Sequence, residues 1–409
     1  MSLAFRIARR ISLGNHRSFS AFITRIAIAA VALSMVVMVV TTASVNGFKY
    51  EISRKIFGFW GHIHINTYDL NYSYEDIQPI SVKQSFYPNL DTLPGVHHIQ
   101  VYANIAGIIK TPDNIEGIML KGIGSDFDWT FLRSFLIQGD TLNLADSTKS
   151  NSILISQKTA KRLMLKTGDG MVVYFVKDRP KVRKFTVAGI YKTGLEEYDE
   201  KYALVDIRHI QKINGWEDDQ VGGFEVILDN VNDIDTMTNL LNDEIIGADT
   251  PLQVQSMKDI DPNIFEWLEL QNTNEQIILV LMIFVAIINM AAALLILILE
   301  RTNMIGILKA LGATNRIVQQ IFLYNAAIIM GVGLFIGNVI GLGVCYLQQH
   351  YGIIKLSEEQ YYLSVAPMKI NWPVLIGLNA GSLIVCVLVM LLPSLMVVAI
   401  QPIKAIRFK

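Results

Sequence analysis

Four long apolar runs constrain the fold of this chain more than any other feature of its sequence. None of them has an Asp, Glu, Lys or Arg in its core, and a helix needs about 20 apolar residues to cross the hydrocarbon of a bilayer. Because ionised groups are costly in the bilayer, the uncharged cores argue against a proton relay or a charged-substrate site there. The sequence therefore predicts four transmembrane helices, at residues 26–47, 273–299, 317–347 and 372–400.

Basic residues beside these spans predict how the chain is oriented. Residues 1–25 carry five Arg and no acid, and the loop 300–316 and the tail 401–409 carry three Lys or Arg each. Lys and Arg concentrate on the cytoplasmic side of membrane proteins. We therefore expect a multi-pass protein with both termini and the loop 300–316 in the cytoplasm. Residues 48–272 and the short loop 348–371 then lie outside.

The segment before the first span allows two interpretations. Leu3, Ile7 and Ile11 recur at helical spacing among several Arg within residues 1–25. This pattern indicates an interfacial helix that lies on the inner leaflet. An ordinary basic flank that only sets the orientation explains it equally well.

The large outside segment, residues 48–272, is predicted to form a mixed α/β domain. Residues 46–276 hold 22 basic and 33 acidic side chains, and both cysteines, Cys345 and Cys386, fall in predicted spans, so this domain has no disulfide. Its length allows two subdomains, with an inserted part near 137–219. Helical periodicity predicts stalks at 48–60 and 264–276. Strands are predicted at 62–65, 96–109, 117–121, 171–176, 184–191, 202–206, 223–228 and 252–255, and helices at 157–166 and 234–245.

Several chemical signatures are missing from the sequence. It contains no GxxxxGK[ST] phosphate loop, no GxSxG elbow and no HExxH helix. We therefore expect no catalytic site and no cofactor. His62 and His64 would share one face of a strand, as two metal ligands could, but no Cys or carboxylate cluster accompanies them. A structural metal site normally needs four ligands, so we predict no metal site.

Small and polar residues within the spans indicate how the helices pack. Gly333, Gly337 and Gly341 repeat every fourth residue and form a smooth stripe that another helix can approach closely. The stripe can face a partner subunit or, as we favour, pack spans within one chain. Asn289 suggests an interhelical hydrogen bond in the second span. Pro393 should kink the fourth span or loosen its last turn.

The loop 300–316 carries the strongest local signal. On a helix, Met304, Ile305, Leu308 and Leu311 form an apolar face, while Arg301 and Lys309 point elsewhere, and Gly312 is a suitable stop. Either a partner docks on this helix, or the helix lies flat on the lipid headgroups. The pattern alone slightly favours the lipid surface.

The same region resembles a known family. Val285–Ala286, Asn289, Leu295, Glu300–Arg301 and Ile305–Thr314 are similar to the second span and coupling helix of the LolC/LolE lipoprotein-releasing permeases. These belong to the wider MacB- and FtsX-like superfamily of mechanotransmitting type VII ABC transporters. The segments 265–268, 194–199 and 393–407 are similar too, so the resemblance covers essentially the whole chain.

The resemblance implies an α-helical bacterial inner-membrane protein with a MacB-like periplasmic core. Its coupling helix would dock on a cytoplasmic ABC ATPase dimer that hydrolyses ATP on a separate subunit. Its other partners would be a second permease copy, identical or different, a lipoprotein substrate, a periplasmic lipoprotein carrier and membrane lipids, but no nucleic acid. The implied ATPase-coupling residues are Glu300, Arg301, Met304, Ile305, Leu308, Lys309 and Leu311.

Two departures from the family pattern affect this interpretation. Met304 stands where the family usually has Glu, so an ion pair with the ATPase is lost or replaced at that point. The predicted hairpin 176–184 is short, whereas some members carry a longer hook there that grips the carrier. Carrier recruitment by this chain is therefore an open question.

Three other functions compete with lipoprotein release. A MacB-like exporter would carry its own ATPase domain, which this sequence lacks. An FtsX-like regulator of a periplasmic partner usually has a smaller outside domain. A ligand-sensing receptor would need a cytoplasmic signalling domain. We therefore expect a permease subunit of a lipoprotein-releasing complex.

Overall fold

The computed structural model describes residues 6, 19–68, 78–110, 115–145, 148–175, 180–246 and 252–394. The chain divides into two compact units, each described by itself. The first, called the membrane unit, comprises Met1–Tyr50, Trp267–Lys355 and Val365–Lys409. The second, called the α/β domain, comprises Glu51–Glu266 and Leu356–Ser364. Most of the predicted segment 1–25, the residues 176–179 and the tail 401–409 lie outside the described residues.

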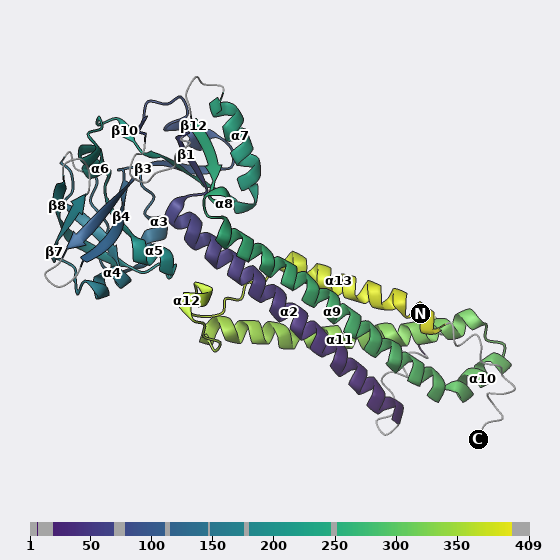
Figure 1. Ribbon diagram of the computed structural model, residues 1–409. Coiled ribbons are helices and arrows are strands. Elements are labelled where there is room, and N and C mark those ends of the chain that lie inside the picture. The colour runs from purple at the N-terminus through teal and green to yellow at the C-terminus, as the bar shows by residue number, and fades with distance from the viewer. Residues whose placement is uncertain are drawn as a thin grey trace. The chain divides into compact units, whose positions relative to one another are not determined.

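Among the described residues, four long helices are apolar enough to cross a membrane, which confirms the prediction of four transmembrane helices (Figure 1). The fourth ends at Val389, before the predicted end at residue 400. At 1.5 Å per residue, the 42 residues of the first helix and the 39 of the second would reach roughly 60 Å each. That is about twice the ~30 Å hydrocarbon thickness of a bilayer. The predicted stalks, 48–60 and 264–276, are thus parts of these two continuous helices, about a third of each. The helices are α2 (Phe19–Trp60), α9 (Pro262–Glu300), α11 (Asn315–Tyr351) and α13 (Trp372–Val389), with the shorter α10 (Thr302–Ala310) and α14 (Leu391–Ser394).

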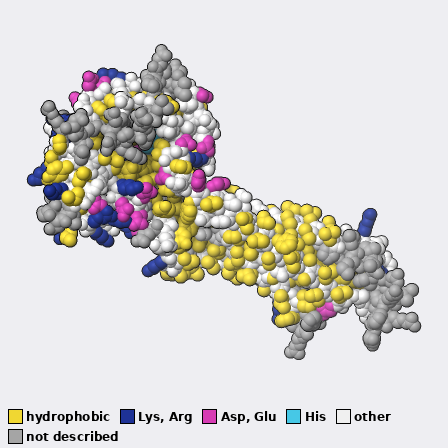
Figure 2. Space-filling view, viewed as in Figure 1, with side chains coloured by type: hydrophobic (Ala, Val, Ile, Leu, Met, Phe, Trp, Pro, Cys, Tyr) yellow, Lys and Arg dark blue, Asp and Glu magenta, His cyan; other side chains and the backbone are white. Residues whose placement is uncertain are grey.

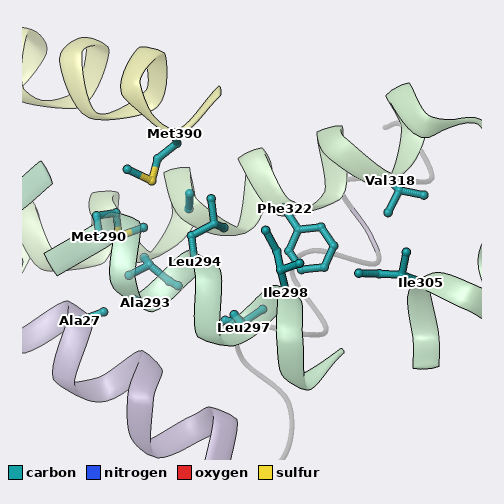
Figure 3. Packing of buried hydrophobic residues seen from close by; sticks show 12 residues of the cluster. Ala27, Met290, Ala293, Leu294, Leu297, Ile298, Ile305, Val318, Phe322 and Met390 are labelled. Atoms are coloured by element: carbon teal, nitrogen blue, oxygen red, sulfur yellow. The ribbon is translucent and has the colours of Figure 1, made fainter. Parts of the chain in front are cut away.

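Large apolar side chains fill the interior of the membrane unit. Figure 3 shows one cluster, in which Leu294 and Ile298 of α9 lie beside Phe322 of α11, and Ile305 of α10 lies next to Val318. Outward-facing side chains of the helices are also largely hydrophobic, as lipid contact requires (Figure 2). Both cysteines are buried here as free thiols.

The glycine stripe of α11 packs against α2 inside the same chain. A Cβ placed on Gly337 would lie 2.6 Å from the Cβ of Met35 and 2.7 Å from the carbonyl oxygen of Ala32. Equivalent contacts join Gly333 to Val31, at 2.7 Å, and Gly341 to Val39, at 3.0 Å. Residue numbers rise together along both helices, so α2 and α11 are parallel. For α2 and α11 to cross a membrane in the same direction, the chain must cross back between them, and α9 is the helix that does so.

This close approach predicts a position-specific effect of adding one methyl group. Gly337→Ala should destabilise the full chain by about 1–3 kcal/mol, because the added carbon overlaps Met35 and the backbone of α2. Gly343→Ala is the matched control, since a Cβ there meets nothing within 4 Å. Thermal unfolding in nanodiscs measures both. Equal unfolding temperatures for the two variants would contradict the packing.

The α/β domain is built on a ten-stranded mixed sheet (Figure 1). Its strand order is β12-β1-β11-β3-β4-β9-β6-β8-β5, while β7 pairs with β3 and β8, and β10 pairs with β2 separately. Each strand predicted from the sequence is present. The strands are β1 (Ile63–Thr67), β2 (Ile80–Ser81), β3 (Val96–Lys110), β4 (Ile115–Ile123), β5 (Leu136–Gly139), β6 (Ser152–Ser156), β7 (Gly170–Phe175), β8 (Lys181–Tyr191), β9 (Tyr202–Asp206), β10 (Gln220–Val221), β11 (Gly223–Leu228) and β12 (Leu252–Ser256).

Short helices connect these strands, and their ends follow local rules. Ser156 caps the helix after β6 by accepting a hydrogen bond from the Thr159 amide, and Gly215, with φ of 75°, ends the helix after β9. The helices are η1 (Asn89–Thr92), α3 (Thr130–Ser134), α4 (Gln157–Arg162), α5 (Glu196–Lys201), α6 (Ile207–Asn214), η2 (Val231–Asp233), α7 (Ile234–Ile246), α8 (Met257–Ile260) and α12 (Glu358–Tyr361).

The part predicted to be inserted, 137–219, shares the sheet with the rest of the domain. Its strand β9 pairs in parallel with β4, and β7 pairs with β3 through Ile108 and Tyr174. The sheet is therefore continuous between residues 137–219 and the rest of the domain.

The connection between α11 and α13 packs on this domain. Lys55 Nζ donates a 2.9 Å hydrogen bond to the Tyr362 carbonyl, and Lys192 pairs with Glu358 at 2.8 Å. Because Leu356–Ser364 belong to the same unit as Glu51–Glu266, this connection and the domain lie on one side of the membrane.

Candidate functional site

The candidate coupling site is α10, which follows α9 after a single non-helical residue, Arg301. The Thr302 hydroxyl donates a 2.7 Å hydrogen bond to the Leu299 carbonyl and so satisfies one of the last carbonyls of α9. The Ile305 amide donates to the Arg301 carbonyl at 3.0 Å, which starts the new helix. A change of direction at this point needs no additional loop.

The other end of α10 stops at a glycine, as the sequence predicts. Gly312 has φ of 91°, a conformation that side chains disfavour. Its amide donates to the Lys309 carbonyl, and the Ala313 amide donates to the Leu308 carbonyl, at 3.0 and 2.9 Å. These two bonds form a Schellman motif. The helix is therefore held at both ends by its own backbone.

The apolar residues of α10 divide between two directions. Ile305 is fully buried, and Met304 packs against the same interior cluster. Leu311 is 80% exposed and Ile307 is 49% exposed. Since residues four apart lie on one side of a helix, Ile307 and Leu311 form one exposed apolar surface. The single apolar face predicted from the sequence is therefore divided, because Met304 and Ile305 pack inward whereas Leu311 is exposed. Ile307 was not among the predicted coupling residues.

The charged residues predicted for coupling lie directly before α10 and within it. Glu300 is exposed at the end of α9, while Arg301 and Lys309 are half-buried, as is Leu308. The Nε atom of Arg301 has no hydrogen-bond partner within the described part of the chain. The site therefore combines an exposed apolar pair with charges of both signs.

Amides within the spans behave differently from one another. The side chain of Asn289 is half-buried and has no hydrogen bond among the residues that the structure describes. Asn338 of α11 and Asn379 of α13 instead form a reciprocal pair, with amide-to-oxygen distances of 2.6 and 3.2 Å. This pair was not predicted, although Asn379 is the only Asn or Gln in residues 372–400 and Asn338 is the only one in residues 326–347. Pro393 lies in α14, after α13 has ended at Val389.

The end of α2 is fixed in the α/β domain by a buried charge, in what we call the α2–sheet junction (Phe59, Trp60, Lys121 and Glu225). Lys121 Nζ lies 2.7 Å from Glu225 Oε1, and both side chains have no exposed surface. The same ammonium donates to the Phe59 carbonyl at the end of α2 and lies 4.6 Å from the centre of the Trp60 ring. Burial lowers the pKa of Lys121 and raises that of Glu225, while their mutual attraction opposes both shifts.

The two histidines weighed as metal ligands are parts of the domain interior. His64 Nε2 donates to the Trp60 carbonyl at 2.7 Å, and His62 Nδ1 accepts from the Leu228 amide at 3.1 Å. Burial lowers the pKa of each to about 4, so both are neutral at pH 7. Across the described ranges, no group of three or more potential metal ligands exists.

Comparison with known proteins assigns the chain to a family. Residues 24–244 match the MacB-like periplasmic core domain, and residues 276–402 match the FtsX-like permease C-terminal family. The chain belongs to the MacB- and FtsX-like permeases. The four candidate spans are therefore those of a membrane permease, and the α/β domain corresponds to the MacB-like periplasmic core domain.

This permease is similar to proteins that carry LolC and LolE names. It is 23% identical to the lipoprotein-releasing system transmembrane protein LolC of Xylella fastidiosa (strain Temecula1 / ATCC 700964), over 98% of this chain and 97% of that one. It is 22% identical to LolE of Haemophilus influenzae (strain ATCC 51907 / DSM 11121 / KW20 / Rd), over 98% of both chains. The uncharacterized ABC transporter permease YknZ of Bacillus subtilis (strain 168) is 26% identical over 84% of this chain and 86% of its own.

Proposed function

We propose that this permease is the membrane subunit of an ATP-driven lipoprotein-releasing complex in a bacterial inner membrane. The observation that carries the proposal is the exposed pair Ile307 and Leu311 on α10, in a sequence without a phosphate loop. An apolar surface beside charges suits a protein partner that desolvates it. The full-length similarity to LolC and LolE supports lipoprotein as the proposed substrate.

In this proposal, residues 300–316 and both termini face the cytoplasm, and α10 docks on an ABC ATPase dimer. Glu300, Arg301 and Lys309 contact the ATPase at the rim of the apolar pair, while Met304, Ile305 and Leu308 hold the helix against the membrane unit. Met304 therefore contributes packing instead of the ion pair that a Glu would offer. A second permease copy, identical or different, completes the membrane part.

Motion would travel along α2 and α9, because each is one continuous helix from the membrane into the α/β domain. A helix transmits displacement, whereas a loop absorbs it. At the far end of α2, the α2–sheet junction prevents the helix from turning independently of β4 and β11. The acyl chains of the lipoprotein would enter between the uncharged spans from the outer leaflet.

We infer that the carrier is not gripped by the β7–β8 hairpin of this chain. These strands are paired as far as Phe175 and Lys181, so residues 176–180 alone connect them. A second copy or another surface of the complex would then receive the carrier.

Depletion of the permease tests the proposed substrate. Lipoproteins destined for the outer membrane should accumulate in the inner-membrane fraction within a few generations, and re-expression should restore their sorting. Normal sorting after depletion would overturn lipoprotein release. It would favour the second candidate, export of another substrate; the relative YknZ, named an uncharacterized ABC transporter permease, is compatible with transport of either kind.

A further inference from the structure

The α/β domain carries an open groove of about 630 Å³, lined mainly by β3, β4, α5, α8 and the first turn of α9. Its volume lies in the range of ~300–1,000 Å³ that is typical of sites for small ligands. All of its lining residues belong to the α/β domain, so the groove is a feature of this domain alone.

One wall of the groove is an apolar face of the sheet that remains accessible. Ala106 and Ile108 of β3 are exposed and lie opposite Met119 and Gly117 of β4, so that each large side chain faces a small residue. A Cβ placed on Gly117 would meet nothing within 4 Å. The solvent-facing side of an antiparallel strand pair is normally polar. This apolar wall is therefore suited to contact with the apolar part of a ligand.

Asp261, between α8 and α9, contributes a carboxylate to the groove and forms no ion pair with any described residue. Its Oδ2 accepts a 3.0 Å hydrogen bond from the Tyr198 hydroxyl, and the Ile264 amide also donates to the carboxylate, which caps α9. Partial burial raises the pKa of Asp261, and the negative charge of Glu197 adds to the rise. A carboxylate offers roughly four acceptor positions, so these two hydrogen bonds leave room for a bound cation.

The other charges along the groove offset one another. Lys201 is the one Lys or Arg among the described lining residues, and its ammonium pairs with Glu197 at 2.6 Å. Burial lowers the pKa of His64 to about 4, so this histidine is neutral at pH 7. The lining therefore keeps one negative charge, that of Asp261, and charge complementarity favours a ligand with one positive charge.

We propose that this groove binds a peptide segment that carries one lysine among apolar side chains. The lysine ammonium, with three donors on an apolar stem, donates to Asp261, and the neighbouring side chains lie on the apolar wall of β3 and β4. A simple alkylamine would leave most of the groove unfilled. The inference rests on the proposed function for the source of the peptide, which would be the protein part of the lipoprotein.

The test is binding of a capped peptide of Leu, Ala and one Lys, labelled with a neutral fluorophore, to the full chain in nanodiscs without the ATPase. Fluorescence anisotropy measures the binding, and empty nanodiscs give the background from lipid. The matched probe is the same peptide with N-acetyl-lysine, which keeps the stem and loses the charge. We expect saturable binding of the lysine peptide and about tenfold weaker binding of the acetylated one, because hydrogen bonds to charged groups are the stronger ones.

Three variants locate the site. Asp261→Asn removes the charge but keeps an oxygen for the Tyr198 hydroxyl and for the cap of α9, so it should fold and bind the lysine peptide about tenfold more weakly. Asp140→Asn, at an exposed aspartate outside the lining, is the matched control and should bind normally. Lys201→Met should instead tighten binding, because it removes the competing ammonium and frees Glu197 for the ligand. A purely structural role of Asp261 would produce no such gain.

Absence of saturable binding, equal affinity for the lysine and acetyl-lysine peptides, or normal binding by Asp261→Asn would overturn the proposal. Displacement of the peptide by hexylamine at equal concentration would overturn it too, and would assign the groove to small amines. If the peptide does not bind but depletion strands lipoproteins on the inner membrane, the groove proposal fails alone. If the peptide binds but depletion leaves lipoprotein sorting normal, lipoprotein release fails alone.

Discussion

Replacing Ile307 and Leu311 together by glutamate should weaken binding of the ATPase to the permease by at least about 100-fold. Burying an apolar side chain of this size contributes roughly 1.5–3 kcal/mol, and each 1.4 kcal/mol is a tenfold change in affinity. The variant loses two such contributions and buries two charges instead. The measurement is titration of the purified ATPase against the full-length variant in nanodiscs.

The matched control is Ile115→Glu, because Ile115 is also an exposed isoleucine, 71% exposed, on the α/β domain. It should bind the ATPase normally. The helix itself should survive in the double variant, since Ile305 remains packed in the membrane unit. Unchanged ATPase affinity together with weaker binding of α10 to lipid would show that the helix lies on the headgroups.

Removing the charge of Lys121 should have the largest effect on the stability of the α/β domain. Lys121→Met leaves Glu225 buried without its partner and leaves the Phe59 carbonyl without its donor, so we expect a loss of about 3–5 kcal/mol. Urea unfolding of the full chain, followed by tryptophan fluorescence, measures the loss. ATP hydrolysis by the bound ATPase should continue while release of substrate falls, since the link between α2 and the sheet is loosened.

Two controls separate this effect from a general loss of a lysine. Lys121→Met combined with Glu225→Leu removes both charges and should recover most of the stability, because a buried pair often contributes little net stability over apolar residues. Lys201→Met breaks the exposed pair with Glu197, which are 59% and 55% exposed, and should cost at most about 1 kcal/mol. Equal losses in Lys121→Met and Lys201→Met would contradict the role of the junction.

Much of the fold follows from local sequence, because its signals are local. Apolar length predicts the spans, and alternation and turn residues predict strands such as β9 and β11. The strand β6 was not predicted, although it has the same length as β9 and, like β9, leads directly into a helix. Its pairing with β8 and β9 depends on chain segments that sequence position does not bring together.

The candidate site was predictable only in part for the same reason. Periodicity identifies α10 and its stop at Gly312, but it does not reveal which apolar side faces the chain's own interior. The side that faces the interior is set by Val318 of α11, which packs next to Ile305. Similarly, Lys121 and Glu225 lie on strands β4 and β11, which are separated in the sheet by β3. No local pattern indicates that they meet.

The most direct test of the account is ATP-dependent release of an acylated lipoprotein from proteoliposomes that contain the permease and its ATPase. The account predicts that lipoprotein enters the soluble fraction only with ATP, that Ile307→Glu with Leu311→Glu abolishes this release, and that Ile115→Glu retains it. Release that proceeds equally without ATP, or equally in the double variant, would contradict the claim that α10 couples a separate ATPase to lipoprotein release.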